Sequence, residues 1–510
     1  MTETYLRPAR PASPDAGTGE RVHDLLAGAA ATWPSATAVR DARGAWTYAG
    51  LDAESRAVAA WLAGQGVGPG ERVLVRIGNR REVAAILYGL ARLGAVFVPI
   101  NPAMKRFHLE RIFHDAEPVL AVTADAEAGA LREFATCPVH GVDALWSALD
   151  RTAVPPVVDV PAGDVAQLIY TSGSTSLPKA VVSPHRAVTF AARAIGRRLG
   201  YRQGDVVFTA VPLSFDYGLY QIFLATLAGA ELFVAPDAAQ PRLLSLIRQA
   251  GATVVPLVPS LGEMLIRLSA RGGGPTAVRM FTNTGAALTP PVIAGLRAAF
   301  PGAGIVPMYG ITECKRATIL EPDGDLVRPG SVGTALPGTE VLILDAEGRP
   351  LPPGEVGEIA VRGPNVMDGY WRAPEMTAQR FRADETTGEV TFHTGDYGRM
   401  DRDGHLYFEG RRDDMFKRRG TRMSVIEIEA AALDVPGVTA AAVLPPEGTR
   451  DLVMYATGDI TGEALLRRLA ERLEDAKVPA ECHILPALPL TDNGKVDKRT
   501  LQLRTAIEPI

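Results

Sequence analysis

The chain has 510 residues, of which 47% are hydrophobic and 22% are charged, a composition typical of ordinary globular proteins. Its length exceeds that of a single average domain, so we expect two or more domains with sizeable cores. The formal net charge of −5 argues against a nucleic-acid-binding surface, and the basic run at residues 417–419 is too short to reverse that conclusion.

Cysteine usage and the apolar segments restrict the class of protein further. Cys137, Cys314 and Cys482 lie far apart, and their odd number fits a reducing compartment better than a disulfide framework or a zinc site. Residues 1–20 are rich in Pro, Ala and Gly without an apolar segment, so they predict a disordered tail and not a signal peptide. Residues 83–100 are apolar but interrupted by Gly, Arg and Pro, which indicates a buried helix and strand and not a membrane span. We therefore expect a cytoplasmic protein.

Strands and helices are predicted to alternate through most of the chain. The first series is helix 21–33, strand 45–48, helix 53–64, strand 72–77, helix 81–93, strand 95–99, helix 106–115 and strand 119–123. The second series, after a Pro-rich connection at 155–161, is strand 166–170, helix 185–199 and the buried strands 206–211, 231–235, 253–258, 279–284 and 305–308. Such alternation predicts an α/β protein whose parallel sheets are covered by helices on both faces. Ligands of such sheets bind outside the carboxyl ends of the strands.

The pattern changes near residue 330. Short alternating strands are predicted at 338–345, 357–362, 393–400 and 405–409, separated by Gly, Pro and Asp turns, which indicates a small β-rich subdomain. A charged segment, a helix at 424–433 and a compact mixture of strands and helices follow. We place the domain boundary at Gly410–Asp414, which gives a large N-terminal domain at 21–410 and a small α+β C-terminal domain at 411–510.

The segment Ile169–Val182, IYTSGSTSLPKAVV, has the features of a phosphate-binding loop. An apolar run leads into six small residues, of which five carry a hydroxyl, and Lys179 follows. Small residues let backbone N–H groups turn towards an anion, while hydroxyls and the lysine add hydrogen bonds and positive charge. The alternative is a flexible Ser/Gly-rich linker.

Three further polar segments follow predicted strands or turns. Residues 308–316, MYGITECKR, combine an aromatic ring, a glycine and a Thr-Glu pair that suits a phosphate and its metal ion, although such a pair is also typical of a helix cap. Residues 394–396, TGD, place an acid after a tight turn, where it can accept hydrogen bonds from a ribose. Residues 490–498, LTDNGKVDK, contain a tight-turn signal that would present Lys495. In isolation, each has a plain structural explanation.

Taken together and in order, these segments resemble one family, the acyl-adenylate-forming enzymes. This family includes acyl-CoA synthetases, nonribosomal-peptide adenylation domains and luciferases. The motifs that carry the resemblance are YTSGSTSLPK, NTGAAL, YGITE, GEIAVRGPNVMDGYW, HTGD, GRRDDMFKRRGTRMSVIEIE and the final NGK. They cover nearly the whole chain, and the sequence contains neither a GKT/S P-loop nor a GxGxxG fingerprint after a strand.

The resemblance implies ATP and Mg²⁺ as cofactors and CoA or phosphopantetheine as a co-substrate. It implies that the triphosphate is bound by Thr171, Ser172, Gly173, Ser174, Thr175 and Lys179, and that the adenine is held by Gly285, Ala286, Ala287 and Tyr309. Gly310 belongs to the ATP site as a position where the backbone can approach the ligand. The resemblance further implies that Asp396 and Arg411 bind the ribose, and that Thr312 and Glu313 bind the α-phosphate and Mg²⁺. Lys495 would bridge the attacking carboxylate and the phosphate. Asp413 would be the hinge of a mobile C-terminal domain, which presents Lys417 and Gly420 for the thiol step.

Two positions depart from the family pattern. Ser176 and Ala180 stand where the loop of this family usually has glycine. If position 176 requires a positive φ, a serine there costs about 1 kcal/mol. The change is either tolerated or typical of a subfamily with a different loop shape.

The segment 213–220, LSFDYGLY, is where the acyl pocket of this family begins. Asp216 occupies the position that pairs with the α-ammonium group in amino-acid-activating members, or it caps the following helix. Tyr217, Tyr220 and Met308 are predicted to line the pocket. Lys315 and Arg316 either face an anionic group near the pocket or on a carrier, or lie exposed.

Three classes of function follow from these motifs. We favour ATP-dependent adenylation of a small carboxylic acid with pyrophosphate release, followed by transfer to the phosphopantetheine thiol of CoA or of a carrier protein. A stand-alone amino-acid-adenylating enzyme that loads a separate carrier protein is a variant of this class. The second class uses the adenylate in a non-thiol second step. A non-catalytic nucleotide-binding module is disfavoured because Lys179, Glu313, Asp396, Arg411 and Lys495 are all present.

Overall fold

The computed structural model describes residues 19–172, 178–236, 242–272, 274–384, 386–411, 415–418, 421–447, 450–473, 475, 477–491 and 496–507. The chain divides into two compact units. The first unit comprises Met1–Val341 with Ala360–His393, and the second comprises Leu342–Ile359 with Thr394–Ile510. The boundary predicted at Gly410–Asp414 lies within the second unit and stays a prediction.

A six-stranded sheet in the first unit has the order β6-β5-β3-β4-β7-β8. Its strands are β3 (Arg72–Arg76), β4 (Val96–Pro99), β5 (Leu120–Thr123), β6 (Val139–Gly141), β7 (Val165–Ser172) and β8 (Pro178–Pro184). Neighbouring strands are parallel except β7 and β8, which form an antiparallel hairpin. The parallel pairs bury both faces, as their continuous apolar runs predict. The segment predicted to bind phosphate joins the two strands of this hairpin.

A nine-stranded sheet in the same unit has the order β15-β14-β13-β12-β11-β9-β10-β1-β2. Its strands are β1 (Thr37–Asp41), β2 (Gly44–Thr47), β9 (Val206–Thr209), β10 (Glu231–Val234), β11 (Val254–Leu257), β12 (Met280–Asn283), β13 (Gly304–Tyr309), β14 (Thr318–Ile319) and β15 (Thr334–Ala335). The strands from β1 to β13 in this order are parallel, and the outer pairs are antiparallel. The predicted α/β class is confirmed.

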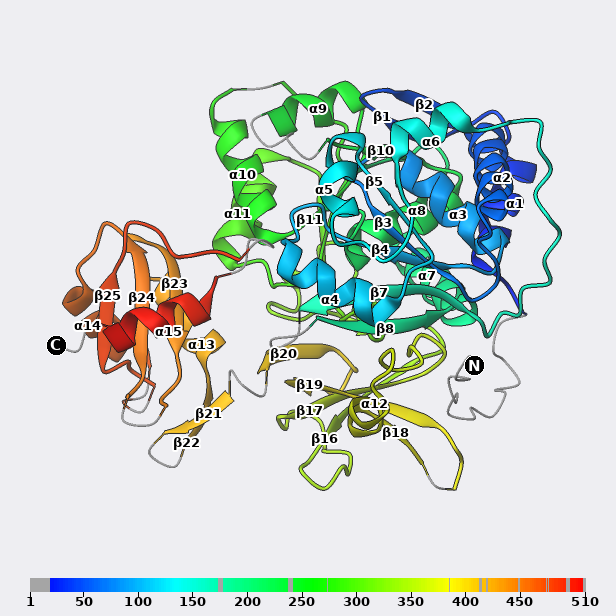
Figure 1. Ribbon diagram of the computed structural model, residues 1–510. Helices are drawn as coiled ribbons and strands as arrows, with labels where there is room; N and C mark the ends of the chain where they lie inside the picture. The colour runs from blue at the N-terminus through cyan, green and yellow to red at the C-terminus, as the bar shows by residue number, and fades with distance from the viewer. Residues whose placement is uncertain are drawn as a thin grey trace. The chain divides into compact units, whose positions relative to one another are not determined.

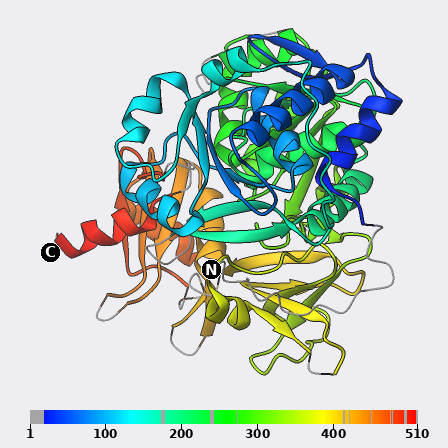
Figure 2. The ribbon, with the colours of Figure 1, turned by 45° about the vertical axis from the view of Figure 1, so that its right-hand side comes forward.

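Helices connect these strands. They are α1 (Val22–Thr32), α2 (Tyr48–Gly64), α3 (Glu82–Arg92), α4 (Arg106–Ala116), α5 (Ala128–Arg132), α6 (Val142–Ala148), α7 (His185–Leu199), α8 (Asp216–Ala228), α9 (Leu243–Ala250), α10 (Pro259–Ala270), α11 (Pro290–Ala299) and α12 (Pro374–Arg380). Helices α1, α2 and α3, drawn in blue, lie side by side in both ribbon views (Figures 1 and 2). Among the described helices, none is long and apolar enough to cross a membrane.

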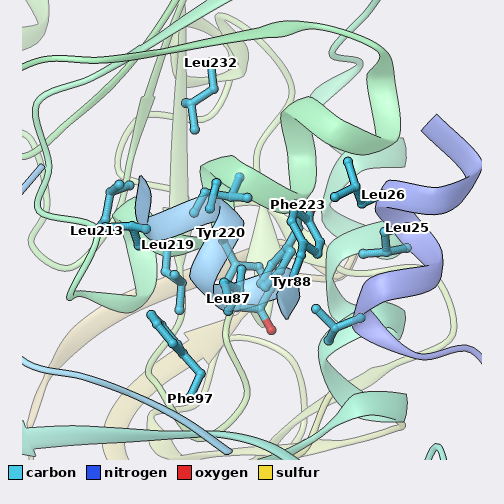
Figure 3. Packing of buried hydrophobic residues seen from close by; sticks show 14 of the residues in the cluster. Leu25, Leu26, Leu87, Tyr88, Phe97, Leu213, Leu219, Tyr220, Phe223 and Leu232 are labelled. Atoms are coloured by element: carbon cyan, nitrogen blue, oxygen red, sulfur yellow. The ribbon is translucent and has the colours of Figure 1, made fainter. Parts of the chain in front are cut away.

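One hydrophobic core joins the two large sheets. It contains side chains of β3 and β4 from the first sheet, of β9 and β10 from the second, and of helices α1, α2, α3, α7 and α8. Helix α8 is buried all round, which is typical of a helix enclosed by other elements. In Figure 3, Leu26 of α1, Tyr88 of α3 and Phe223 of α8 converge in this core. The core therefore fixes the start of α8, where the predicted acyl pocket begins.

The β-rich region and the C-terminal region have the predicted character. The β-rich region contains β16 (Glu340–Leu344), β17 (Gly357–Arg362), β18 (Phe381–Ala383), β19 (Val390–Met400) and β20 (Leu406–Arg411). The C-terminal region contains β21 (Met415–Arg418), β22 (Thr421–Ser424), α13 (Val425–Leu433), β23 (Val438–Leu444), β24 (Val453–Gly458), α14 (Gly462–Ala470), β25 (Glu481–Ile484) and α15 (Lys498–Ile507). Strands β23, β24 and β25 form a three-stranded sheet that packs on α13 and α14.

Several short elements differ from the prediction. Helices α5 and α6 and strand β6 lie in a region where no element was predicted, and α2 begins at Tyr48, five residues before the predicted start at Ala53. Helix α5 and strand β6 are too short to show a hydrophobic period, so tertiary packing and not local pattern determines them. The start of α2 is fixed by Thr47, whose hydroxyl accepts a hydrogen bond from the Gly50 N–H.

A buried histidine at the start of α7 makes stability depend on pH. The Nδ1 atom of His185 accepts a hydrogen bond of 3.1 Å from the Val22 N–H, and burial lowers the His185 pKa to about 3 from an ordinary value of 6.5. The folded chain thus keeps this imidazole neutral, while the unfolded chain protonates it below pH 6.5. We expect the free energy of unfolding to fall as pH decreases below 6.5, by up to about 1.4 kcal/mol per pH unit from this residue.

Urea unfolding between pH 8 and 5 measures this dependence. His185→Asn is expected to flatten the slope below pH 6.5, whereas His114→Asn, at an exposed position of α4, serves as the matched control. Equal slopes for both variants and the unaltered chain would contradict the assignment to His185.

Candidate active site

The hairpin β7–β8 places the predicted phosphate lysine beside its loop. Thr171 lies opposite Lys179 in the antiparallel register. Gly173, Ser174 and Thr175 lie outside the described residues, as does Ser176, and the side chain of Ser172 is likewise outside. Their predicted contacts with a triphosphate stay predictions.

Lys179, Glu313 and Tyr370 form a compact polar cluster in the first unit. The Lys179 Nζ lies 2.9 Å from the Tyr370 hydroxyl and 3.3 Å from Glu313 Oε1. The Tyr370 hydroxyl donates a hydrogen bond of 2.6 Å to that same carboxylate oxygen. Burial and the charge of Glu313 raise the pKa of Tyr370, so its hydroxyl keeps its proton and acts as a donor. The predicted phosphate and metal groups are thus brought together.

Tyr370 was not among the predicted site residues. It belongs to the motif GPNVMDGYW, which signalled the family resemblance but carried no assigned role. Its ring also lies under the Lys179 ammonium group, with the nitrogen 4.2 Å from the ring centre. The residue is 191 positions from Lys179, so sequence spacing alone could not reveal the contact.

Removing the Tyr370 hydroxyl is expected to destabilise the ligand-free protein. Tyr370→Phe keeps the ring and deletes a hydrogen bond to a buried carboxylate, a loss of about 1.5–3 kcal/mol. Tyr407→Phe is the matched control, because its hydroxyl makes a longer contact of 3.3 Å with Asp401. Thermal unfolding without nucleotide should show the lower midpoint for Tyr370→Phe. Equal midpoints for the two variants would contradict this role.

Asp216 lies between two buried cations. Its carboxylate approaches Lys315 Nζ at 3.0 Å through Oδ1 and Arg316 NH1 at 3.3 Å through Oδ2. Lys315 is 0% exposed and Arg316 is 4% exposed, so the alternative that these cations lie on the surface is wrong. The alternative that Asp216 caps α8 is also wrong, because the N-cap residue is Phe215 and the carboxylate is directed to the cations.

The first turn of α8 is held close to the preceding segment. A Cβ atom added at Gly218 would lie 2.2 Å from the Pro212 carbonyl oxygen, so only glycine fits there. The Lys315 ammonium group also donates to Ser183 Oγ at 3.2 Å, which connects the cation pair to β8. Ser183 is a second contact that the sequence analysis did not identify.

Two predicted pocket tyrosines contact the cations. The Arg316 guanidinium group lies 4.9 Å from the centre of the Tyr217 ring, and Lys315 Nζ lies 5.6 Å from that of Tyr220. The Tyr217 hydroxyl donates to the Thr282 carbonyl oxygen at 2.7 Å. Met308 is buried in the same core as both tyrosines.

Several buried polar atoms around Asp216 lack a hydrogen-bond partner within the described residues. They are Ser214 Oγ, Asp216 Oδ1, the Tyr220 hydroxyl and Arg316 Nε. Although Asp216 Oδ1 lies 3.0 Å from Lys315 Nζ, the angles do not meet hydrogen-bond geometry. Buried polar groups in native proteins are nearly always satisfied, so this group of atoms fits a polar ligand or bound water.

The predicted adenine segment lies after β12. Gly285, Ala286 and Ala287 are exposed, and β12 is the parallel neighbour of β13, so the carboxyl ends of both strands meet at one sheet edge. Tyr309 is the last residue of β13, and Gly310 follows it directly. Thr312 and Glu313 lie in a turn and not at the start of a helix. The helix-cap alternative for this Thr-Glu pair is therefore wrong.

The remaining predicted residues belong to the second unit. Asp396 in β19 is buried, and it lies directly opposite Arg411 of β20 in the antiparallel strand register. Lys417 lies in β21, but its side chain and that of Arg411 are outside the described part of the chain. Asp413, Gly420 and Lys495 are themselves outside it, so their assigned roles stay predictions.

Comparisons with known families and proteins agree with this arrangement. The profile described as "AMP-binding enzyme" matches residues 26–371, and that described as "AMP-binding enzyme C-terminal domain" matches residues 427–495. A relative from Pseudomonas fluorescens, "L-proline--[L-prolyl-carrier protein] ligase", is 32% identical over 508 residues, which cover 94% of this chain and 98% of the relative. The chain spans 40% or less of seven longer curated relatives.

Two solved structures of one protein, VinN, are also similar. The complex of VinN with L-aspartate is 48% identical, has a TM-score of 0.72 and covers 77% of this chain and 99% of VinN. The complex of VinN with 3-methylaspartate is 44% identical, has a TM-score of 0.67 and covers 76% of this chain and 99% of VinN.

Proposed function

Since this chain belongs to the family of AMP-binding enzymes, we propose that it activates an amino acid that carries a second carboxylate and loads it onto a separate carrier protein. The resemblance predicted from the motifs is confirmed. The chain is an ATP-dependent acid–thiol ligase, which forms an acyl-adenylate with release of pyrophosphate and passes the acyl group to a phosphopantetheine thiol.

The observation that carries the proposal is the buried group of one anion and two cations. Asp216 complements an ammonium group, while Lys315 and Arg316 supply one more positive charge than Asp216 neutralises. An excess buried charge is costly unless it is paired, so a carboxylate of the substrate is the natural partner. The other carboxylate of the same molecule, which the cations do not bind, is then free to attack ATP.

The two VinN complexes support this choice of substrate. L-Aspartate and 3-methylaspartate each carry one ammonium group and two carboxylates, which matches the charges around Asp216. The proline–carrier protein ligase supports a carrier protein as the acceptor, because this chain covers nearly all of it. A neutral amino acid would leave the excess positive charge unpaired.

The described residues near Lys179 fit a bound Mg²⁺ ion. Glu313 offers a carboxylate oxygen and Thr312 a hydroxyl, and Mg²⁺ is usually held by one or two carboxylates together with phosphate oxygens and water. The ion would offset the negative charge that gathers during attack on the α-phosphate. In this proposal Lys179 binds the phosphates, and Tyr370 orients the Glu313 carboxylate. The ribose is assigned to Asp396 and Arg411, and the acid-activating step to Lys495.

Amino-acid-dependent pyrophosphate exchange tests the substrate. L-Aspartate, 3-methylaspartate and L-glutamate are compared with L-asparagine, L-proline and β-alanine. We expect at least about a hundredfold higher kcat/KM for the best dicarboxylic amino acid than for L-asparagine, because a site that pairs a buried charge rejects analogues without it. A preference for L-proline or for another neutral acid would overturn the proposal.

Variants of the cation pair test the cause of that preference. Lys315→Met and Arg316→Met are each expected to reduce the ratio of kcat/KM between the dicarboxylic amino acid and L-asparagine by about tenfold or more. Arg271→Met, at an exposed position after α10, is the control. If the ratio is unchanged in both variants, the cations do not recognise the second carboxylate.

The acceptor is tested separately. The enzyme, ATP and the preferred amino acid are incubated with CoA or with phosphopantetheinylated carrier proteins. The masses of the thioester products are then measured by mass spectrometry. We expect an aminoacyl adduct on a carrier protein. Formation of the CoA thioester alone would overturn this half of the proposal and leave the substrate half intact.

A further inference from the structure

The two cations reach one carboxylate because the backbone between them has an unusual conformation. Successive residues of an extended strand point to opposite sides. Lys315, however, has a φ of +64°, in the left-handed region that residues with a Cβ atom seldom adopt. This turn directs the side chains of Lys315 and of the next residue, Arg316, to the same partner, Asp216.

The side chain of Asn365 holds the backbone on both sides of this turn. Its Nδ2 atom donates hydrogen bonds of 3.1 Å to the carbonyl oxygens of Cys314 and Arg316, which flank Lys315. Asn365 is 0% exposed, so water does not compete for these bonds. Both amide hydrogens are used, and the reversed orientation would set the Asn365 oxygen against two carbonyl oxygens.

Glycine at position 310 supports the same turn from another side. A Cβ atom added there would lie 2.1 Å from the Lys315 carbonyl oxygen and 2.7 Å from Arg316 Cα. The backbone that carries both cations is thus enclosed between Gly310 and Asn365. The Met367 N–H, two residues after Asn365, donates to the Glu313 carbonyl oxygen at 2.9 Å, which ties the same two segments together.

We propose that Asn365 is a positioning residue for substrate specificity: it holds the left-handed turn that aims Lys315 and Arg316 at the second carboxylate of the substrate. The inference rests on the proposed function, because that function assigns the two cations to the substrate. Asn365 does not touch the substrate in this account. It acts through the backbone of the two residues that do.

A double-mutant cycle in pyrophosphate exchange tests this coupling. Asn365→Ala is expected to raise the KM for the best dicarboxylic amino acid about tenfold, which is the size of one or two lost hydrogen bonds, and to leave the KM for ATP within about twofold. In the Lys315→Met background, the same change should raise the amino-acid KM less than about twofold, because one cation that Asn365 aims is already absent. Asn101→Ala, at a half-buried asparagine in the turn before α4, is the control.

The outcomes separate this inference from the proposed function. The inference is overturned if Asn365→Ala raises the KM for the amino acid and the KM for ATP equally. It is also overturned if Asn365→Ala raises the amino-acid KM by the same factor in the unaltered enzyme and in Lys315→Met. In either case Asn365 has only a structural role. If Lys315→Met alone leaves the dicarboxylate preference intact, Lys315 does not bind the second carboxylate and this inference is overturned, whereas the proposed function fails only if the unaltered enzyme prefers a neutral acid. Should Asn365→Ala not fold, Asn365→Ser keeps one donor and is expected to raise the amino-acid KM by a smaller factor, again without a change for ATP.

Discussion

Asp216→Asn is expected to abolish amino-acid-dependent pyrophosphate exchange, with kcat/KM reduced by at least about 10²–10³. The substrate ammonium group would lose its only charged partner in the proposed complex. Lys315 and Arg316 would also remain buried without a counter-charge, and breaking a buried ion pair in this way costs about 3–5 kcal/mol of stability. Exchange assays and thermal unfolding measure the two effects independently.

A compensating variant separates these two causes. Asp216→Asn combined with Lys315→Met removes one charge of each sign, so we expect much of the lost stability to return while exchange with dicarboxylic amino acids stays low. Recovery of both stability and exchange in the double variant would contradict the assignment of Asp216 to the substrate ammonium group.

Lys495→Ala is expected to reduce adenylate formation by about 10²–10³, the usual effect of deleting one preorganised group that stabilises charge in the transition state. Transfer from a supplied acyl-adenylate to the thiol should survive, because the family resemblance assigns that step to another face of the C-terminal domain. Pyrophosphate exchange reports the first half-reaction, and single-turnover thiolation reports the second.

The matched control lies three residues further along the chain. Lys498 begins α15 and pairs with Glu429 at 2.9 Å, so Lys498→Ala should leave adenylation unchanged apart from a small loss of stability. If Lys495→Ala slows both half-reactions equally, two predictions are wrong: that Asp413 is a hinge, and that the C-terminal domain presents one face for adenylation and another for the thiol step.

Local patterns in the sequence were sufficient for the main elements of the fold. Helix α7 was predicted with the observed bounds, and the parallel strands β9 to β13 were recognised as apolar runs that are buried on both faces. Elements of three to seven residues, such as β6 and α6, were missed because they have too few positions to show a period. Their positions depend on contacts between distant parts of the chain.

Residues of the candidate site could be predicted from the sequence where they belong to a motif of the family with a known role. Lys179, Glu313 and Asp216 were identified in this way, and the structure brings the first two together. The roles of Tyr370 and Asn365 were not predicted, since a conspicuous motif does not tell which of its side chains point inward. The contact between Asp216 and Arg316 joins residues 100 positions apart, so only the folded chain reveals it.

The hairpin β7–β8 limits how this sequence can change. Lys179 and Ser183 share one face of β8, and they contact Glu313 and Lys315 respectively. They are four positions apart along the strand, about 14 Å at roughly 3.4 Å per residue. An insertion of one residue between them would turn one of the two side chains to the opposite face, because strand side chains alternate. Homologous enzymes that keep both contacts should therefore show no single-residue insertion or deletion in this part of β8, whatever acid they activate.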